Sequence, residues 1–129
     1  MTNIPKDNCI EKICNLPQDF KSANKSSMTL LQESKFTDFY NVITKQDVQD
    51  YLSRQLNIID TWEIWSEDKR TWGYYLSISP DKYFVGSLDK DGKENFSKSF
   101  PTAEEACAEF ILREVSAILD IKNDKINYA

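Results

Sequence analysis

Histidine is absent from this chain of 129 residues, and glycine and cysteine are scarce, at three residues each. Without histidine there can be no Ser-His or Cys-His nucleophile pair, no imidazole acid or base and no histidine metal ligand. Gly73, Gly86 and Gly92 do not form the clustered spacing of a phosphate-binding loop or a dinucleotide fingerprint. The sequence therefore predicts no cofactor and no metal, and catalysis would have to use carboxylates.

The cysteines do not match a disulfide framework, because their number is odd. Cys9 and Cys14 are five residues apart, which places them on different sides of a helix, and Cys107 is distant from both. We interpret all three as reduced, partly buried thiols. Apolar runs of signal-peptide or membrane-span length are also missing, so the sequence predicts a cytoplasmic protein.

Positive charge is in deficit, with 16 basic against 21 acidic residues and a net charge of −5. This balance opposes binding to phosphate backbones or anionic membranes and favours a basic partner. A helix, a meander and a second helix also make up the double-stranded RNA-binding domain. The terminal helix here begins TAEEACAEF, which is acidic where that domain needs lysines. We expect no direct contact with nucleic acid or membrane.

The segment SLDKDGKENFSK has some likeness to a calcium-binding loop, through Asp89, Asp91 and Gly92. That loop needs an acidic residue at its first position and a glutamate at its twelfth, where this chain has Ser87 and Lys98. We instead predict a hairpin turn at Asp91-Gly92, because glycine supplies the positive φ that such turns require.

Hydrophobic periodicity predicts a mainly helical region over residues 1–57. Thr44 and Asp47 form the cap signature of the clearest of these helices. The run FTDFYNVI is rich in β-branched and aromatic residues, so a strand is the alternative interpretation of this segment. The predicted helices cover about 5–16, 28–43 and 44–57, with a polar loop over 17–27.

The period changes to two over residues 60–100, where four segments are separated by short turns. These segments are TWEIWSE, TWGYYLSIS, KYFVGSL and NFSKSF. We predict that they form a four-stranded antiparallel meander. A long helix over 102–120 follows, capped by Thr102 with Glu105 three residues later, and packs on the sheet. The prediction is one α+β domain over residues 1–129.

The long helix has an apolar stripe that should face the sheet, formed by Ala103, Cys107, Phe110, Ile111 and Ile118. The predicted solvent side comprises Glu105, Glu109, Arg113 and Ser116. Glu114 breaks the pattern, because it falls within the apolar stripe. A carboxylate there needs water at the sheet edge or a polar partner; the alternative is a catalytic or ligand-binding acid.

Alternation in TWGYYLSIS separates the two faces of a strand. The face expected against the long helix holds Trp72, Tyr74, Leu76 and Ile78. The other face holds Tyr75, Ser77 and Ser79, and we expect it to include Glu63, Trp65, Ser87, Ser97 and Ser99. Tyrosine, tryptophan and serine together are typical of protein-binding surfaces. The alternative is that the amino-terminal helices cover this face and bury Trp65 and Tyr75.

Acidic residues lie near the predicted strand ends and turns, where they form a solvated rim or a docking surface for a basic partner. Together with the polar face they define a candidate partner interface. Its residues are Glu63, Trp65, Glu67, Asp68, Tyr75, Ser77, Asp81, Asp89, Asp91 and Glu94.

The segment WGYYLSISPDKYFVGSLDKDGKENFSKSFPTAEEACAEFI resembles the strand-strand-strand-helix module of small immunity proteins from bacterial polymorphic-toxin and contact-dependent growth inhibition systems. The resemblance covers about residues 60–119. It implies a non-catalytic protein that binds and neutralises the toxin domain encoded beside it, often a nuclease, in a stoichiometric complex. Two alternatives remain: an adaptor or regulatory interaction domain unrelated to a toxin, and an enzyme that uses carboxylates.

Overall fold

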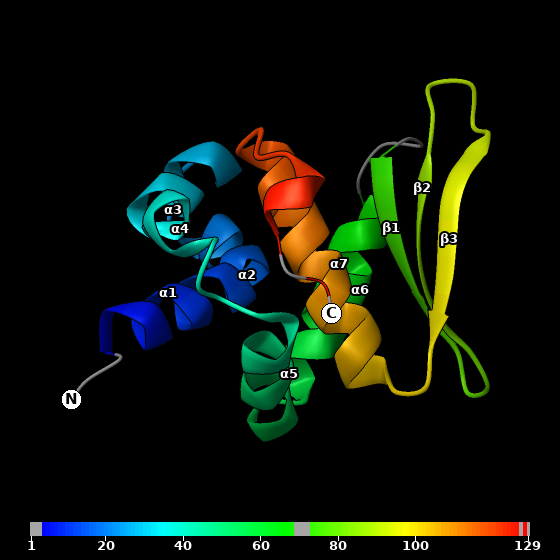
Figure 1. Ribbon diagram of the computed structural model, residues 1–129, viewed down its shortest axis with the longest axis horizontal. Coiled ribbons are helices and arrows are strands. Elements are labelled where there is room, and N and C mark those ends of the chain that lie inside the picture. The colour runs from blue at the N-terminus through cyan, green and yellow to red at the C-terminus, as the bar shows by residue number, and fades with distance from the viewer. Residues whose placement is uncertain (1–3, 69–72, 127, 129) are drawn as a thin grey trace.

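The structure, a computed structural model, describes residues 4–68, 73–126 and 128 (Figure 1). Along this part of the chain, helices precede and follow a three-stranded sheet. The elements are α1 (Ile4–Cys14), α2 (Leu16–Ser22), α3 (Ser27–Glu33), α4 (Phe36–Phe39), α5 (Lys45–Arg54), α6 (Asn57–Asp68), β1 (Gly73–Ile78), β2 (Tyr83–Leu88), β3 (Glu94–Phe100), α7 (Ala103–Ile118) and a 3-10 turn (Asn123–Lys125). The predicted α+β class is confirmed.

The sheet is an antiparallel meander in the order β1-β2-β3, so the prediction of four strands is wrong. The segment TWEIWSE, expected as the first strand, belongs to α6. Its alternation of large and polar residues coincides with a helical stripe, because Ile58, Trp62 and Trp65 recur at spacings of four and three. Trp62 is fully buried, as a position on the inner side of a helix should be.

The helices of the amino-terminal region begin and end at other residues than predicted, because of Pro17 and of Lys35, whose backbone is in the left-handed conformation. Pro17 lies in the first turn of α2, where its missing N–H breaks no helical hydrogen bond, so much of the expected loop over 17–27 is helix. The expected helix over 28–43 is split into α3 and α4 at Lys35, which has φ 68°. The strand alternative for this region is wrong. The capping box of Thr44 and Asp47 at the start of α5 is confirmed.

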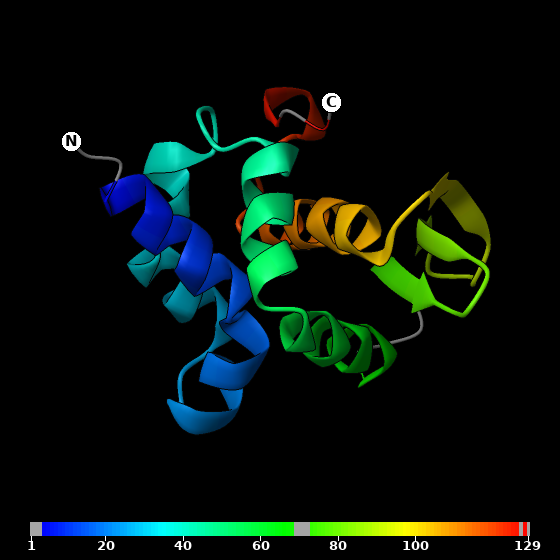
Figure 2. The ribbon, with the colours of Figure 1, turned by 90° about the horizontal axis from the view of Figure 1, so that it is seen from below.

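The fold has three layers, with the sheet on one outer side and α1–α4 on the other (Figures 1 and 2). Helix α7 lies in the middle and contacts all three strands as well as α5 and α6. Cys107, Phe110 and Ile111 of its expected apolar stripe are fully buried. Glu109, expected on its solvent side, is fully buried instead, because it faces Lys98 of β3 and Lys45 of α5. Ser116, also expected in solvent, is fully buried as well.

The three cysteines are free thiols in the core, as predicted. Burial raises the pKa of Cys9 to about 12 and also raises the pKa of Cys14 and Cys107. A thiol with so high a pKa is not a thiolate at neutral pH and is a poor nucleophile. Among the helices of the described residues, none has the length and apolar character needed to cross a membrane.

Candidate functional site

The two faces of the sheet separate as the alternation predicted. Tyr74, Leu76 and Ile78 pack into the core below, whereas Ser77 on the outer face is exposed; Trp72 lies outside the described residues. Among the described residues, no helix lies over the outer face, because the helices are all on the other side (Figures 1 and 2). The alternative that the amino-terminal helices cover this face is therefore wrong.

Tyr75 does not project from the outer face toward a partner. Its ring lies over Gly86, its cross-strand neighbour on β2, so closely that a Cβ at Gly86 would overlap the ring. The hydroxyl of Tyr75 donates a hydrogen bond of 2.8 Å to Oε1 of Glu94 on β3. Burial, together with this bond to a carboxylate, raises the pKa of Tyr75. The aromatic ring thus covers the gap that glycine leaves in the sheet.

The rest of the outer face is small and polar. Ser77, Ser97 and Ser99 are exposed, and half-buried Phe84 lies between Ser77 and Ser99 in the register. Ser87, which was expected on this face, pairs with Tyr74 and therefore shares the inner side. The structure brings Tyr75, Ser77 and Glu94 of the candidate interface together here.

Trp65 lies on the helical side of the molecule, so its expected position beside Tyr75 on one sheet face is wrong. Its ring contacts Phe20 of α2 edge to face, with centroids 5.4 Å apart, and Trp62 at 5.7 Å. Its indole N–H donates a hydrogen bond of 3.0 Å to Oε2 of Glu114 on α7. Glu114 is buried, and this bond supplies the polar partner that its place in the apolar stripe required.

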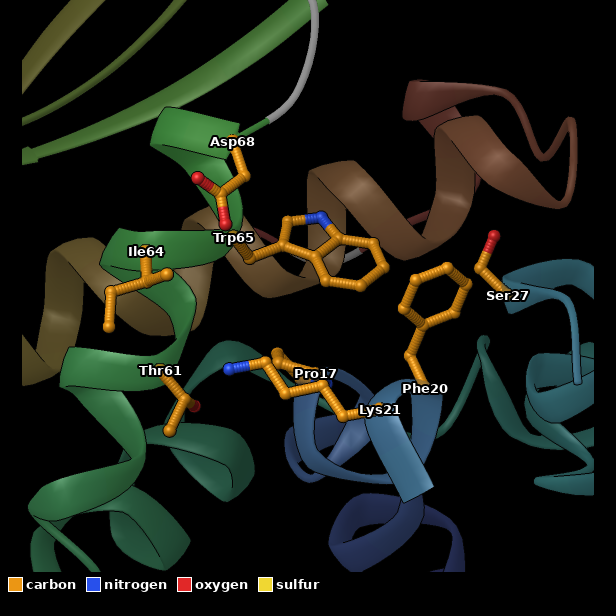
Figure 3. A pocket seen from close by; sticks show the side chains of 8 residues that line it. All are labelled: Pro17, Phe20, Lys21, Ser27, Thr61, Ile64, Trp65 and Asp68. Carbon is orange, nitrogen blue, oxygen red and sulfur yellow. The ribbon is translucent and has the colours of Figure 1, made fainter. Parts of the chain in front are cut away.

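A surface pocket of about 400 Å³ lies where α2 meets α6 (Figure 3). We call it the α2–α6 pocket. Its lining residues are Pro17, Phe20, Lys21, Ser27, Thr61, Ile64, Trp65 and Asp68. Phe20 and Ile64 are each 46% exposed, although both are large and apolar. In Figure 3 Lys21 extends from α2 toward α6, and Asp68 lies near the carboxyl end of α6.

Helix α6 is acidic. Asp60, Glu63, Glu67 and Asp68 all belong to α6, and its last turn carries no basic residue. Burial raises the pKa of Glu63, and the carboxylates of Glu67 and Asp60 raise it further. Carboxylates near a helix carboxyl end are disfavoured by the helix dipole. The potential around α6 therefore favours cationic neighbours. Of its acids Asp68 lines the pocket, together with Lys21 of α2.

The remaining candidate residues are scattered. Asp81 follows β1, whereas Asp89 and Asp91 follow β2, so these acids lie at opposite ends of the meander. The carboxylate of Asp89 accepts hydrogen bonds from the backbone N–H groups of Asp91 and Lys93, each at 2.9 Å. Gly92 has φ 82°, which confirms the predicted turn. The ten candidate residues therefore do not form one surface. Two of them, Trp65 and Asp68, line the α2–α6 pocket.

A buried charge cluster was missed by the sequence patterns. Glu109 of α7 is fully buried and pairs with Arg113 at 2.9 Å, with Lys45 of α5 at 3.3 Å and with Lys98 of β3 at 3.4 Å. Lys45 also pairs with Glu105 at 3.1 Å. Three cations around one buried carboxylate join α5, α7 and β3. The helical spacing predicted that Glu109 is exposed to solvent. This prediction was wrong because the periodicity of one helix does not show which other elements pack against that helix.

Arg113 is held in place by aromatic rings as well as by Glu109. Its guanidinium carbon is 4.3 Å from the ring centroid of Phe96 and 4.2 Å from that of Tyr128. Burial raises the pKa of Tyr128 to about 12, despite the opposing charge of Arg113. These contacts stabilise the inner face of the sheet and leave no cation of the cluster without a partner.

Phe20 was also missed, because residues 17–27 were expected to be a loop. Its helical spacing of four from Leu16, with Pro17 at the helix start, is the pattern that could have indicated α2.

A second pocket, of about 360 Å³, lies between α1 and α5 and is lined by Asp7, Ile10, Glu11, Asp47, Asp50, Tyr51 and Arg54. Asp47 is already paired with Lys6 at 3.0 Å and with the backbone of Thr44. Within the described ranges, no group of three or more histidine, cysteine or acidic residues is arranged to hold a metal ion.

Comparison of the chain with protein-family models, with curated proteins and with solved structures finds no match.

Proposed function

We propose that the protein binds a partner protein through the α2–α6 pocket, and that this partner is a bacterial toxin domain, which the complex neutralises. The single observation that carries the binding proposal is the pair Phe20 and Ile64, each 46% exposed at the mouth of an apolar pocket. Large apolar side chains gathered around a hollow are typical of the centre of a protein interface.

The pocket has the features of an anchor site. Trp65 lines it and is fixed by its contact with Trp62 and by the hydrogen bond to Glu114. A fixed wall loses little side-chain entropy when a ligand binds. An apolar side chain of a partner that enters the pocket would remove Phe20 and Ile64 from water, at about 25 cal/mol per Å² of apolar surface.

The toxin assignment is supported by the resemblance over residues 60–119 and by charge. The net charge is −5, and helix α6 carries Asp60, Glu63, Glu67 and Asp68 with no basic residue in its last turn. Toxin domains that act on nucleic acid carry basic surfaces, so an acidic inhibitor is drawn to them by long-range electrostatic attraction. A neutralising complex of this kind requires no catalytic group in the inhibitor.

Ile64→Ser tests the pocket. We expect it to weaken binding of the toxin domain encoded beside the gene by about 30-fold or more, because hot-spot truncations cost about 2 kcal/mol or more. The measurement is titration calorimetry, with growth rescue of toxin-expressing cells as the second readout. Val42→Ser is the matched control, because Val42 is 50% exposed and does not line the pocket.

Wild-type affinity in Ile64→Ser, with the fold intact by circular dichroism, would exclude the pocket as the binding site. Tight binding of a partner that has no toxic activity would instead favour the adaptor alternative. Repeating the titration at high salt measures the electrostatic share of the affinity.

A further inference from the structure

The two edges of the sheet differ in whether other parts of the chain bind their outward backbone groups. At the β1 edge, the backbone N–H of Leu76 donates a hydrogen bond of 2.8 Å to Oγ of Ser66. The backbone N–H of Ile78 is bound by the carboxylate of Glu63. Two side chains of α6 thus occupy two of the donors that a further strand would need. Glu63, a predicted interface residue, is part of this edge protection.

The register then shows which backbone groups point outward at the other edge. Because the N–H of Leu76 points away from β2, Leu76 and Val85 are a non-hydrogen-bonded pair. Val85 must therefore direct its N–H and C=O toward Lys98 of β3. Alternation along β3 leaves the N–H and C=O groups of Ser97 and Ser99 pointing out of the sheet.

This β3 edge is accessible. It forms the outer rim of the sheet in Figure 1, with no helix of the described residues beside it. Asn95, Ser97 and Ser99 are exposed and have short side chains, and the strand contains no proline. Its backbone groups are therefore available to a further strand.

Pairing with a second copy of the chain is disfavoured in both simple antiparallel registers. A two-fold axis at Lys98 would set the two Lys98 ammonium groups opposite each other, and like charges directly opposite are destabilising. An axis at Ser97 would use Asn95, but Asn95 is the extra residue in the bulge between the Ser87–Phe96 and Leu88–Glu94 pairs. The edge is better suited to a different sequence.

We propose that the β3 edge accepts an extended segment of the partner protein as a fourth, antiparallel strand. On the helical side that segment would place an acidic residue opposite Lys98, whose side chain is 46% exposed, between apolar residues opposite Phe96 and Phe100. On the outer side, small polar residues would meet Ser97 and Ser99. The occupant is the partner of the proposed function, so this inference rests on that function.

The first experiment uses a peptide as the probe and needs no toxin. The ¹⁵N-labelled protein is titrated with acetyl-TVTETVT-amide, and with acetyl-TVTKTVT-amide as the charge-reversed control. We expect shifts and slowed solvent exchange at the amides of Ser97 and Ser99, at least about tenfold weaker for the lysine peptide. The Lys98 amide, already directed at β2, should keep its protection.

The second experiment uses variants in the complex with the toxin domain. Ser97→Pro removes an outward N–H without removing a hydrogen bond to β2, whereas Ser97→Ala keeps the N–H and is the matched control. We expect Ser97→Pro to weaken toxin binding at least about tenfold and Ser97→Ala to leave it unchanged. Equal melting temperatures show that both variants are folded.

The outcomes separate this inference from the proposed function. Toxin binding that is lost in Ile64→Ser but unchanged in Ser97→Pro would overturn the strand proposal and leave the pocket in place. Peptide binding at Ser97 and Ser99 without any toxin binding would support the edge as a strand acceptor while overturning the toxin as its occupant. If these amides are protected only when the protein dimerises at high concentration, the added strand comes from a second copy of the chain. That result would overturn the proposal that it comes from a different protein.

Discussion

On the inner face of the sheet, Leu76, Val85 and Phe100 are buried under α7, whereas on the outer face Ser77, Ser97 and Ser99 meet solvent directly. Both faces carry aromatic rings, but their partners differ. Tyr74 and Phe96 lie beside the guanidinium of Arg113 in the core, and Tyr75 lies over Gly86. An aromatic residue on a polar face therefore does not by itself identify a binding site, because the sheet can use the ring to cover its own backbone.

The comparison also separates two kinds of charge. Glu109 on the inner side is fully buried among Lys45, Lys98 and Arg113, whereas Glu94 on the outer side is exposed and accepts from Tyr75. Removing one member of a buried ion network leaves the others without compensation in a poorly solvating environment. Removing an exposed carboxylate leaves groups that water can solvate. The two glutamates should therefore differ widely in their effect on stability.

The largest expected effect comes from Glu109→Gln, which preserves the shape of the side chain and removes its charge. We expect the free energy of unfolding to fall by about 3–5 kcal/mol, because Lys45 and Arg113, which are largely withdrawn from solvent, lose the carboxylate that they share. Urea denaturation followed by circular dichroism measures the change. Glu94→Gln is the control and should cost less than about 1 kcal/mol. Equal costs at the two positions would contradict the difference between the faces.

Adjacent positions on β1 give the next effect. Leu76→Ala should lower the free energy of unfolding by about 3 kcal/mol, because Leu76 is only 3% exposed and its truncation leaves a cavity under the sheet. Ser77→Ala changes an exposed side chain on the opposite face and should stay within about 0.5 kcal/mol. The measurement is again urea denaturation. A large cost at Ser77 would show that something covers the outer face.

The smallest effect tests the Tyr75 ring itself. Gly86→Ala should cost about 1–2 kcal/mol, because the added methyl group overlaps the ring and forces it to move. In a Tyr75→Ala background the same substitution should cost nothing, or be slightly stabilising, because alanine is favoured over glycine in a strand. A double-mutant cycle on unfolding free energies measures this coupling. Additive effects would show that the ring does not lie over Gly86.

The sequence predicted correctly those features that depend only on residues close to one another in the chain. The Thr44–Asp47 capping box, the Thr102 cap of α7 and the turn at Gly92 were all confirmed, because each depends on residues within a few positions. The faces of β1 were also predicted, since alternation along a strand is local. The fourth strand was wrong because TWEIWSE fits periods of two and of about 3.6 alike in so short a window.

The candidate site depended on non-local packing and was predicted only in part. Trp65 and Asp68 were named, but the pocket that they line also needs Phe20 and Ile64 from α2 and α6. Glu114 was singled out from its position in an apolar stripe, and its partner Trp65 was named separately as an interface residue. Pattern alone could not join these two, because they are 49 residues apart in sequence.

By itself the sequence determined the α+β class, the meander, the capped terminal helix, the reduced thiols and the acidic charge of this protein. The tertiary structure decided which sides of those elements are covered: that Glu109 is buried, that Tyr75 covers Gly86, that α6 closes one edge of the sheet and that β3 remains open. The physical reason is that caps, turns and alternation act between neighbouring residues, whereas burial and exposure depend on which distant segments pack together.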